Sequence, residues 1–278
     1  MHYLYNKKIM LVKGYFKMTL KEQISAYMKN LPETLFPNIL KEKATVFLSG
    51  SCGWNIPEGK DDKADWDLHI ILNNTDYDKY FIRDTVSATI DDKEHTPIVF
   101  GQIRNMDWLD QRVTQENLLY LWIYTHGLFV QDPLDVETKV SQCIDEFRKN
   151  LPEIIKKHYV TFATRSYDLK SCIKRDLCVS AGLHRGEAVK AALQVLCLLK
   201  GKPYPYNKWL PKYVFDCLYH NHERKKDLVD IFTDVLMIQD LQLLYSKTKE
   251  LNKIMQEIVT SHISETDWVN RWWLYNEN

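Results

Sequence analysis

The sequence predicts an α+β protein, with a mixed β-sheet and its helices in the first half and a helical bundle in the second. Strand-like runs of β-branched and aromatic residues are confined to the first half, at residues 45–48, 65–72, 98–103 and 128–130. From about residue 137, long patterns with helical spacing replace them. We therefore predict two domains, residues 1–140 and 141–278, with residues 1–17 as a poorly ordered extension of the first.

The elements of the first domain follow from local patterns. Leu20, Ile24 and Met28 recur at helical spacing and predict a helix over residues 20–30. The strand at residues 45–48 leads directly into a Gly-Ser turn, and a polar loop separates it from the strand at 65–72. Helices are expected at about residues 76–90 and 114–124, each followed by a strand.

The second domain shows helical patterns throughout. The clearest covers Gly186 to Leu199 and is stopped by Gly201 and Pro203. Residues 227–262 contain two more such patterns. The tryptophans near the C-terminus have helical spacing and predict a packed final helix, with Trp268, Trp272 and Trp273 on it.

Composition narrows the possible partners and compartments. Lys plus Arg and Asp plus Glu both total 37, so no net charge attracts the chain to nucleic acid, which is not an expected partner. Residues 1–140 hold 16 basic and 20 acidic residues, a weak preference for a cationic ligand. Six cysteines without a C-x-x-C pair are typical of reduced thiols in a cytoplasmic protein. No apolar run is long enough for a signal peptide or a membrane span.

One short region has the residues for metal and phosphate chemistry. Strand alternation places Asp65 and Asp67 on the same face, where two carboxylates repel each other unless a divalent cation lies between them. Mg²⁺ is the expected cofactor, bound by Asp65 and Asp67. The turn at Gly50 and Ser51 offers backbone N–H groups and a hydroxyl that can hold a phosphate, and Gly50 leaves room for its approach.

These residues carry a resemblance to a known superfamily. Leu48-Ser49-Gly50-Ser51, thirteen intervening residues and Asp65-Trp66-Asp67-Leu68 resemble the signature of polymerase-β-like nucleotidyltransferases. The helical second half resembles that of bacterial antibiotic nucleotidyltransferases, such as the aminoglycoside-modifying enzymes. The segment from Lys202 to Leu210 is similar to a stretch in uncharacterised bacterial members.

The resemblance implies a fold and an activity. The first domain would have the nucleotidyltransferase-type mixed sheet. The enzyme would move a nucleoside monophosphate, AMP from ATP, to a hydroxyl of a small molecule, such as an aminoglycoside-type antibiotic, and release pyrophosphate. Asp65 and Asp67 would be the catalytic metal ligands, and Gly50 and Ser51 would bind the nucleotide.

The second domain also offers candidate residues. Lys190 resembles the helical-domain lysine that reaches nucleotide phosphates in the antibiotic-modifying enzymes, and its alternative role is a solvated partner of Glu187, three residues earlier. Lys208 is expected to be a loop residue. The aromatic residues Tyr204, Tyr206 and Trp209 are expected to pack in the core or between domains, with stacking on a base or a drug ring as the alternative.

The sequence departs from the superfamily pattern at one point. Many members have a third acid on a later strand, whereas the strand at residues 98–103 offers Gln102, and Glu94 and Asp107 are expected to be solvated loop charges. Two alternatives therefore stay open beside the small-molecule transferase. One is a toxin-like enzyme that nucleotidylates a protein or tRNA, and the other is a catalytically silent nucleotide-binding protein.

Overall fold

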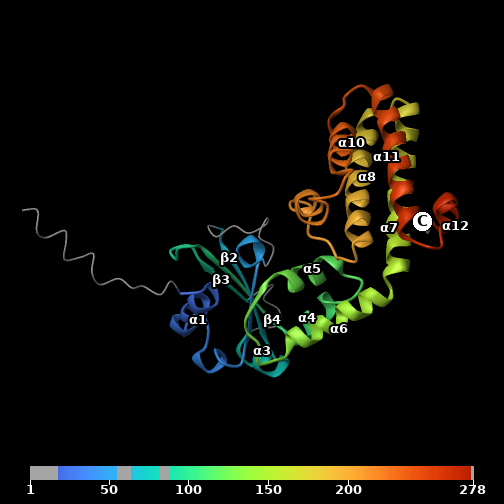
Figure 1. The fold of residues 1–278 in the computed structure, drawn as a ribbon. Helices are drawn as coiled ribbons and strands as arrows, with labels where there is room; N and C mark the ends of the chain where they lie inside the picture. Colours follow the sequence, from blue (N-terminus) through green and yellow to red (C-terminus); the bar gives the residue numbers. More distant parts are fainter. Residues whose placement is uncertain (1–17, 55–63, 82–87, 277–278) are drawn as a thin grey trace, which may run out of the picture.

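The computed structural model describes residues 18–54, 64–81 and 88–276, and the extension expected at residues 1–17 lies outside these ranges. Figure 1 shows a part built around a β-sheet and a part built of long helices. Helix α6 (Val136–Lys149) leads from the first part into α7 (Leu151–Lys174), which runs up through the second.

The sheet has five strands in the order β3-β4-β2-β1-β5. Strands β2 and β4 are parallel and the other neighbours are antiparallel, so the sheet is mixed and the predicted α+β class is confirmed. The strands are β1 (Thr45–Ser49), β2 (Trp66–Leu72), β3 (Ala88–Asp92), β4 (Val99–Asn105) and β5 (Leu128–Gln131). Four of them match the strands expected from the sequence.

The two faces of the sheet differ. On one face, Trp66, Leu68 and Ile70 of β2 are buried in a cluster with apolar residues of α1 (Leu20–Asn30). On the other face, α5 (Leu118–His126) covers β1, and its Tyr124 stacks on Phe47 with the ring centroids 4.6 Å apart. Because β2 alternates, Asp67 and His69 belong to this second face.

The shorter elements complete the sheet part. The helix expected at residues 76–90 is wrong at its end: α3 (Asn74–Tyr80) ends before Phe81, residues 82–87 lie outside the described ranges, and residues 88–92 form strand β3, which pairs with β4. This pairing overrides the local helical pattern. The helix expected at 114–124 is α5, and α4 (Met106–Arg112) was not expected. Two single turns also belong here, η1 (Asn38–Leu40) and α2 (Gly50–Gly53).

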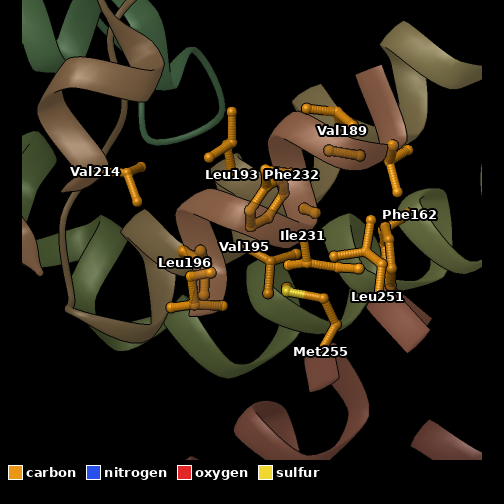
Figure 2. Close-up of a cluster of buried hydrophobic side chains, with 14 of the residues drawn as sticks. Phe162, Val189, Leu193, Val195, Leu196, Val214, Ile231, Phe232, Leu251 and Met255 are labelled. Carbon is orange, nitrogen blue, oxygen red and sulfur yellow. The ribbon is translucent and has the colours of Figure 1, made fainter. Parts of the chain in front are cut away.

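The helical part is a bundle with one buried apolar cluster. Figure 2 shows side chains from α7, α8, α10 and α11 meeting there, among them Phe162, Leu193, Ile231 and Leu251. The helices are α8 (Cys178–Leu199), α9 (Leu210–Lys212), η3 (Tyr213–Leu218, a π-helix), α10 (Lys225–Met237) and α11 (Leu241–His262). Helix α8 begins a full two turns before Gly186, because its first turns pack beside α7 as a helical hairpin.

The C-terminus differs from the single packed helix that was expected. Trp268 lies in α12 (Asp267–Asn270), whereas Trp272 and Trp273 lie in the short 3₁₀ helix η4 (Trp272–Tyr275), where Trp273 is 58% exposed. No helix among the described residues has the length and apolar character needed to cross a membrane.

Candidate functional site

The Gly-Ser turn and the acidic strand are in direct contact. Ser49 pairs with Asp67 in the register of β1 and β2, and the chain turns immediately afterwards at Gly50. Gly50 has a φ of +69°, and a Cβ atom on it would lie 2.3 Å from Asp67 Oδ2. Only glycine fits both the backbone conformation and this contact. The structure therefore brings Gly50, the half-buried Ser51 and Asp67 to one place, as the spacing predicted.

The two carboxylates influence each other. Asp65 lies immediately before β2, and both it and Asp67 are exposed to solvent at the edge of the turn. Although Asp67 is exposed as a whole, its carboxylate packs against Gly50, and this partial burial raises the pKa of Asp67. The charge of Asp65 raises that pKa further, whereas the charge of Lys208 lowers it. A divalent cation between the two carboxylates would offset their mutual repulsion.

The donor set fits Mg²⁺ bound together with a nucleotide. Within residues 18–54, 64–81 and 88–276, no group of three or more His, Cys, Asp or Glu side chains is placed to hold a metal ion. Mg²⁺ commonly binds through one or two carboxylates and completes its shell with waters and substrate phosphates. Asp65 and Asp67 provide two such carboxylates, and the absence of a side chain at Gly50 lets the Asp67 carboxylate lie directly against the backbone of the turn.

A buried hydrogen-bond network of Ser49, His69 and Tyr124 holds the backbone of Asp67 in place. Ser49 Oγ donates to the backbone oxygen of Asp67 at 3.1 Å and lies 3.4 Å from His69 Nε2. The Tyr124 hydroxyl is 2.8 Å from His69 Nδ1. Burial lowers the pKa of His69 to about 4, and the nearby charge of Arg104 lowers it as well. His69 was not among the residues predicted for the site, although strand alternation puts its side chain on the same face as that of Asp67.

The strand next to β2 does not supply a third carboxylate beside Asp67. The register of β2 and β4 places Phe100 directly opposite Asp67, and Gln102 opposite His69. Gln102 is therefore two residue pairs further along β4 than Phe100, the residue adjacent to the acid. Phe100 is 40% exposed, and Asp91 of β3 is the next residue in the same row. The position on β4 beside Asp67 is thus occupied by an aromatic ring.

The other acids considered from the sequence lie elsewhere. Asp107 Oδ1 accepts a hydrogen bond from Asn74 Nδ2 at 2.6 Å at the start of α4. Glu94 is exposed in the turn between β3 and β4. Asp91 forms an ion pair with Lys93 at 3.2 Å. The description of Glu94 and Asp107 as surface charges agrees with this geometry.

The two candidate lysines of the helical part are placed differently. Lys190 is exposed on α8 and makes no hydrogen bond or ion pair with the described residues. Its neighbour Glu187 pairs instead with Arg165 of α7, at 3.0 Å. Lys208, which was expected to be only a loop residue, is close enough to Asp67 to lower the pKa of that carboxyl group. Lys208 is therefore the lysine that the fold brings to the acidic pair.

Aromatic contacts hold the Lys208 region to the sheet part. The ring of Trp54, which follows α2, lies edge-on to Trp209 at 4.9 Å and to Trp122 of α5 at 4.8 Å. Lys208 Nζ lies over the Trp209 ring, 5.1 Å from its centroid. Trp209 Nε1 donates to the hydroxyl of Tyr206 at 3.1 Å, and Tyr206 is 37% exposed. Trp209 thus packs between the two parts, in agreement with the packing role expected for it.

Comparison with known proteins gives limited guidance. No protein-family model matches the sequence, and no curated protein is significantly similar to it. A solved structure of a nucleotidyltransferase-like protein from Exiguobacterium sibiricum 255-15 is similar over 87% of this chain and 75% of its own, with 11% sequence identity and a TM-score of 0.44. At that level the similarity assigns neither a family nor an activity to this chain.

Proposed function

We propose that this protein transfers a nucleoside monophosphate from a nucleoside triphosphate to a hydroxyl group, with release of pyrophosphate. The observation that carries the proposal is the contact between Gly50 and the Asp67 carboxylate. It puts the backbone N–H groups of the turn directly beside a pair of acids whose repulsion favours a bound cation. Phosphate binding and metal binding would then occur in adjacent positions, as nucleotidyl transfer requires.

Each residue of the site has a distinct role in this proposal. Asp65 and Asp67 would hold Mg²⁺, which when bound supplies positive charge to the phosphate oxygens. Gly50 and Ser51 would donate hydrogen bonds to the departing pyrophosphate. Lys208 would add positive charge on the opposite side, since it already lies within electrostatic reach of Asp67. ATP is the proposed donor.

The acceptor is proposed to be a small molecule with a hydroxyl group, of which aminoglycoside-type antibiotics are one class. The exposed rings of Phe100 and Tyr206 give the site apolar surface, which suits a ring-containing acceptor. The excess of acidic residues in the first 140 residues favours a cationic one. These two features support a small molecule better than a nucleic acid, whose phosphates need a basic face.

A second candidate function is nucleotide binding without transfer. Phe100 favours it, because the position beside Asp67 has a phenyl ring where a carboxylate would activate the acceptor hydroxyl. The metal and phosphate positions would be kept while the general base is lost. The same fold would then act as a nucleotide-responsive binding protein.

One experiment separates these functions. Magnesium and ATP, GTP, CTP and UTP are titrated by calorimetry, and pyrophosphate release is then measured with aminoglycosides, lincosamides, bulk tRNA and lysate protein as acceptors. Release with one acceptor class, abolished in Asp67→Asn, supports transfer to that class. Nucleotide binding without release for any acceptor supports the silent protein. Absence of Asp67-dependent nucleotide binding overturns both.

A further inference from the structure

The segment Tyr204–Tyr213, called the strap below, forms a tyrosine–histidine hydrogen bond at each of its ends. At one end, the Tyr204 hydroxyl lies 2.9 Å from Nε2 of His158 in α7. At the other, the Tyr213 hydroxyl lies 3.2 Å from Nε2 of His126 in α5. The strap is thus tied to a helix of the helical part and to a helix of the sheet part. It spans the junction between them.

The positions of the hydrogen atoms in both pairs follow from a second contact. Nδ1 of His158 is 2.9 Å from the carbonyl oxygen of Ile154, and Nδ1 of His126 is 2.9 Å from that of Trp122. A carbonyl oxygen only accepts, so Nδ1 carries the hydrogen in each ring. In the neutral rings Nε2 is therefore an acceptor, and each tyrosine hydroxyl donates to it.

Between these two anchors the strap carries side chains toward the acidic pair. Lys208 Nζ lies over the Trp209 ring, which contacts Trp54 at the end of the turn helix α2, so the strap places Lys208 next to the turn that contacts Asp67. Trp209 is fixed by its edge-on contact with Trp54. Pro205 and Pro211 restrict the backbone within the strap. The strap is thus held at its ends and stiffened between them before any ligand binds.

We propose that Tyr204 and Tyr213 are positioning residues. They hold the strap in the conformation in which Lys208 can contact the phosphates of the nucleotide. The inference rests on the proposed function, because it assumes that the nucleotide binds at Asp65 and Asp67. A side chain that is already in place loses little conformational freedom on binding, so affinity increases without any new contact to the ligand. The two tyrosines act only through Lys208.

This dependence on Lys208 is what the experiment tests. Binding of magnesium with α,β-methylene-ATP, which cannot be cleaved at the transferred phosphorus, is measured by calorimetry for Tyr213→Phe, Lys208→Ala and the double variant. Loss of one hydrogen bond should weaken binding in Tyr213→Phe by about three- to tenfold. In the Lys208→Ala background, Tyr213→Phe should cause no further loss, because the lysine that it positions is absent.

A matched control is available in the same part of the molecule. The Tyr219 hydroxyl donates to the Leu196 carbonyl oxygen at 3.4 Å, a bond within the helical part that does not involve the strap. Tyr219→Phe removes a buried tyrosine hydroxyl as well, and its nucleotide affinity should equal that of the parent. Equal losses in Tyr219→Phe and Tyr213→Phe would show a general structural effect and overturn the inference.

The remaining outcomes keep the two proposals apart. If Asp67→Asn binds the nucleotide as well as the parent does, the proposed function fails. If binding depends on Asp67 but Tyr213→Phe is unchanged, or if its effect persists without Lys208, only the strap inference fails. If Tyr213→Phe does not fold, the same comparison of single and double variants is made with Tyr204→Phe, because the Tyr204 hydroxyl forms the hydrogen bond at the other end of the strap.

Discussion

Gly50 and Asp67 are packed so closely that no side chain fits between them: a Cβ atom on Gly50 would lie 2.3 Å from Asp67 Oδ2. The φ of +69° at Gly50 adds a second requirement for glycine. The contact joins the turn after β1 to the acid on β2, and it fixes the position of the carboxylate relative to the backbone N–H groups of the turn. The first prediction follows from this contact.

Gly50→Ala should displace the Asp67 carboxylate and abolish binding of magnesium with ATP. The left-handed conformation should also cost about 1–2 kcal/mol of the free energy of unfolding. Gly182→Ala is the control, because a Cβ there meets nothing within 4 Å and alanine favours the helix by about 0.5–1 kcal/mol. Calorimetry and urea unfolding measure both quantities. A Gly50→Ala protein that binds like the parent would place the phosphate elsewhere.

Asp67→Asn should abolish turnover without harming the fold. Loss of a metal ligand removes several kcal/mol of transition-state stabilisation, about a thousandfold or more in rate. Because burial and the charge of Asp65 raise the pKa of Asp67, its ionised form is disfavoured in the metal-free protein, and the neutral amide should keep or increase the melting temperature at pH 7.

Asp91→Asn provides the comparison for this variant, since Asp91 lies in the same row of the sheet but pairs with exposed Lys93. It should have little effect on turnover or stability. A large fall in the melting temperature of Asp67→Asn, or full activity, would contradict a metal-binding role. Pyrophosphate release measures turnover, and thermal unfolding without metal measures the melting temperature.

Lys208→Ala and Lys190→Ala should differ in nucleotide affinity. A charged hydrogen bond to phosphate contributes about 1.5–3 kcal/mol, so Lys208→Ala should bind ATP about ten- to a hundredfold more weakly in the presence of magnesium. Among the residues that the structure describes, Lys190 makes no hydrogen bond or ion pair that links it to the acidic pair, and Lys190→Ala should bind within about twofold of the parent. Titration calorimetry compares them directly. The reverse order would support the role that the superfamily resemblance implies for Lys190.

His126 should make the protein sensitive to acid. Burial lowers its pKa to about 4, from 6.5 for an unperturbed histidine. Between these values the unfolded chain binds the proton and the folded protein does not. The free energy of unfolding is therefore unaffected by the titration of His126 above about pH 6.5. It decreases as the pH falls toward 4, by up to about 3 kcal/mol.

His126→Gln removes this titration and keeps a side chain that can accept from Tyr213. Urea unfolding at pH 7 and pH 4.5 should show a smaller loss of stability in this variant than in the parent. His69 has a similarly lowered pKa and should account for part of the loss that remains. Identical pH dependence in both proteins would mean that His126 is already protonated when folded.

The sequence by itself determined the mixed sheet, the helical second half and the core of the site. Strand alternation and the Gly-Ser turn are local patterns, and they pointed to the Gly-Ser turn and the Asp67 strand, which lie in contact at Gly50 and Asp67. The period of two specifies which side chains share a face, so the Asp pair needed no tertiary information. The chemical roles of Asp65, Asp67, Gly50, Ser51 and Lys190 stay predictions.

Only the tertiary structure decided which residues meet this core from distant segments. The pairing of β3 with β4 made a strand of the end of an expected helix, and the pairing of β2 with β4 set Phe100, rather than Gln102, opposite Asp67. The contact of Trp54 with Trp209 brought the strap, and with it Lys208, to the acids. Strand register and packing between segments far apart in sequence depend on the whole fold, because no local pattern records which partner a strand or an aromatic ring will find.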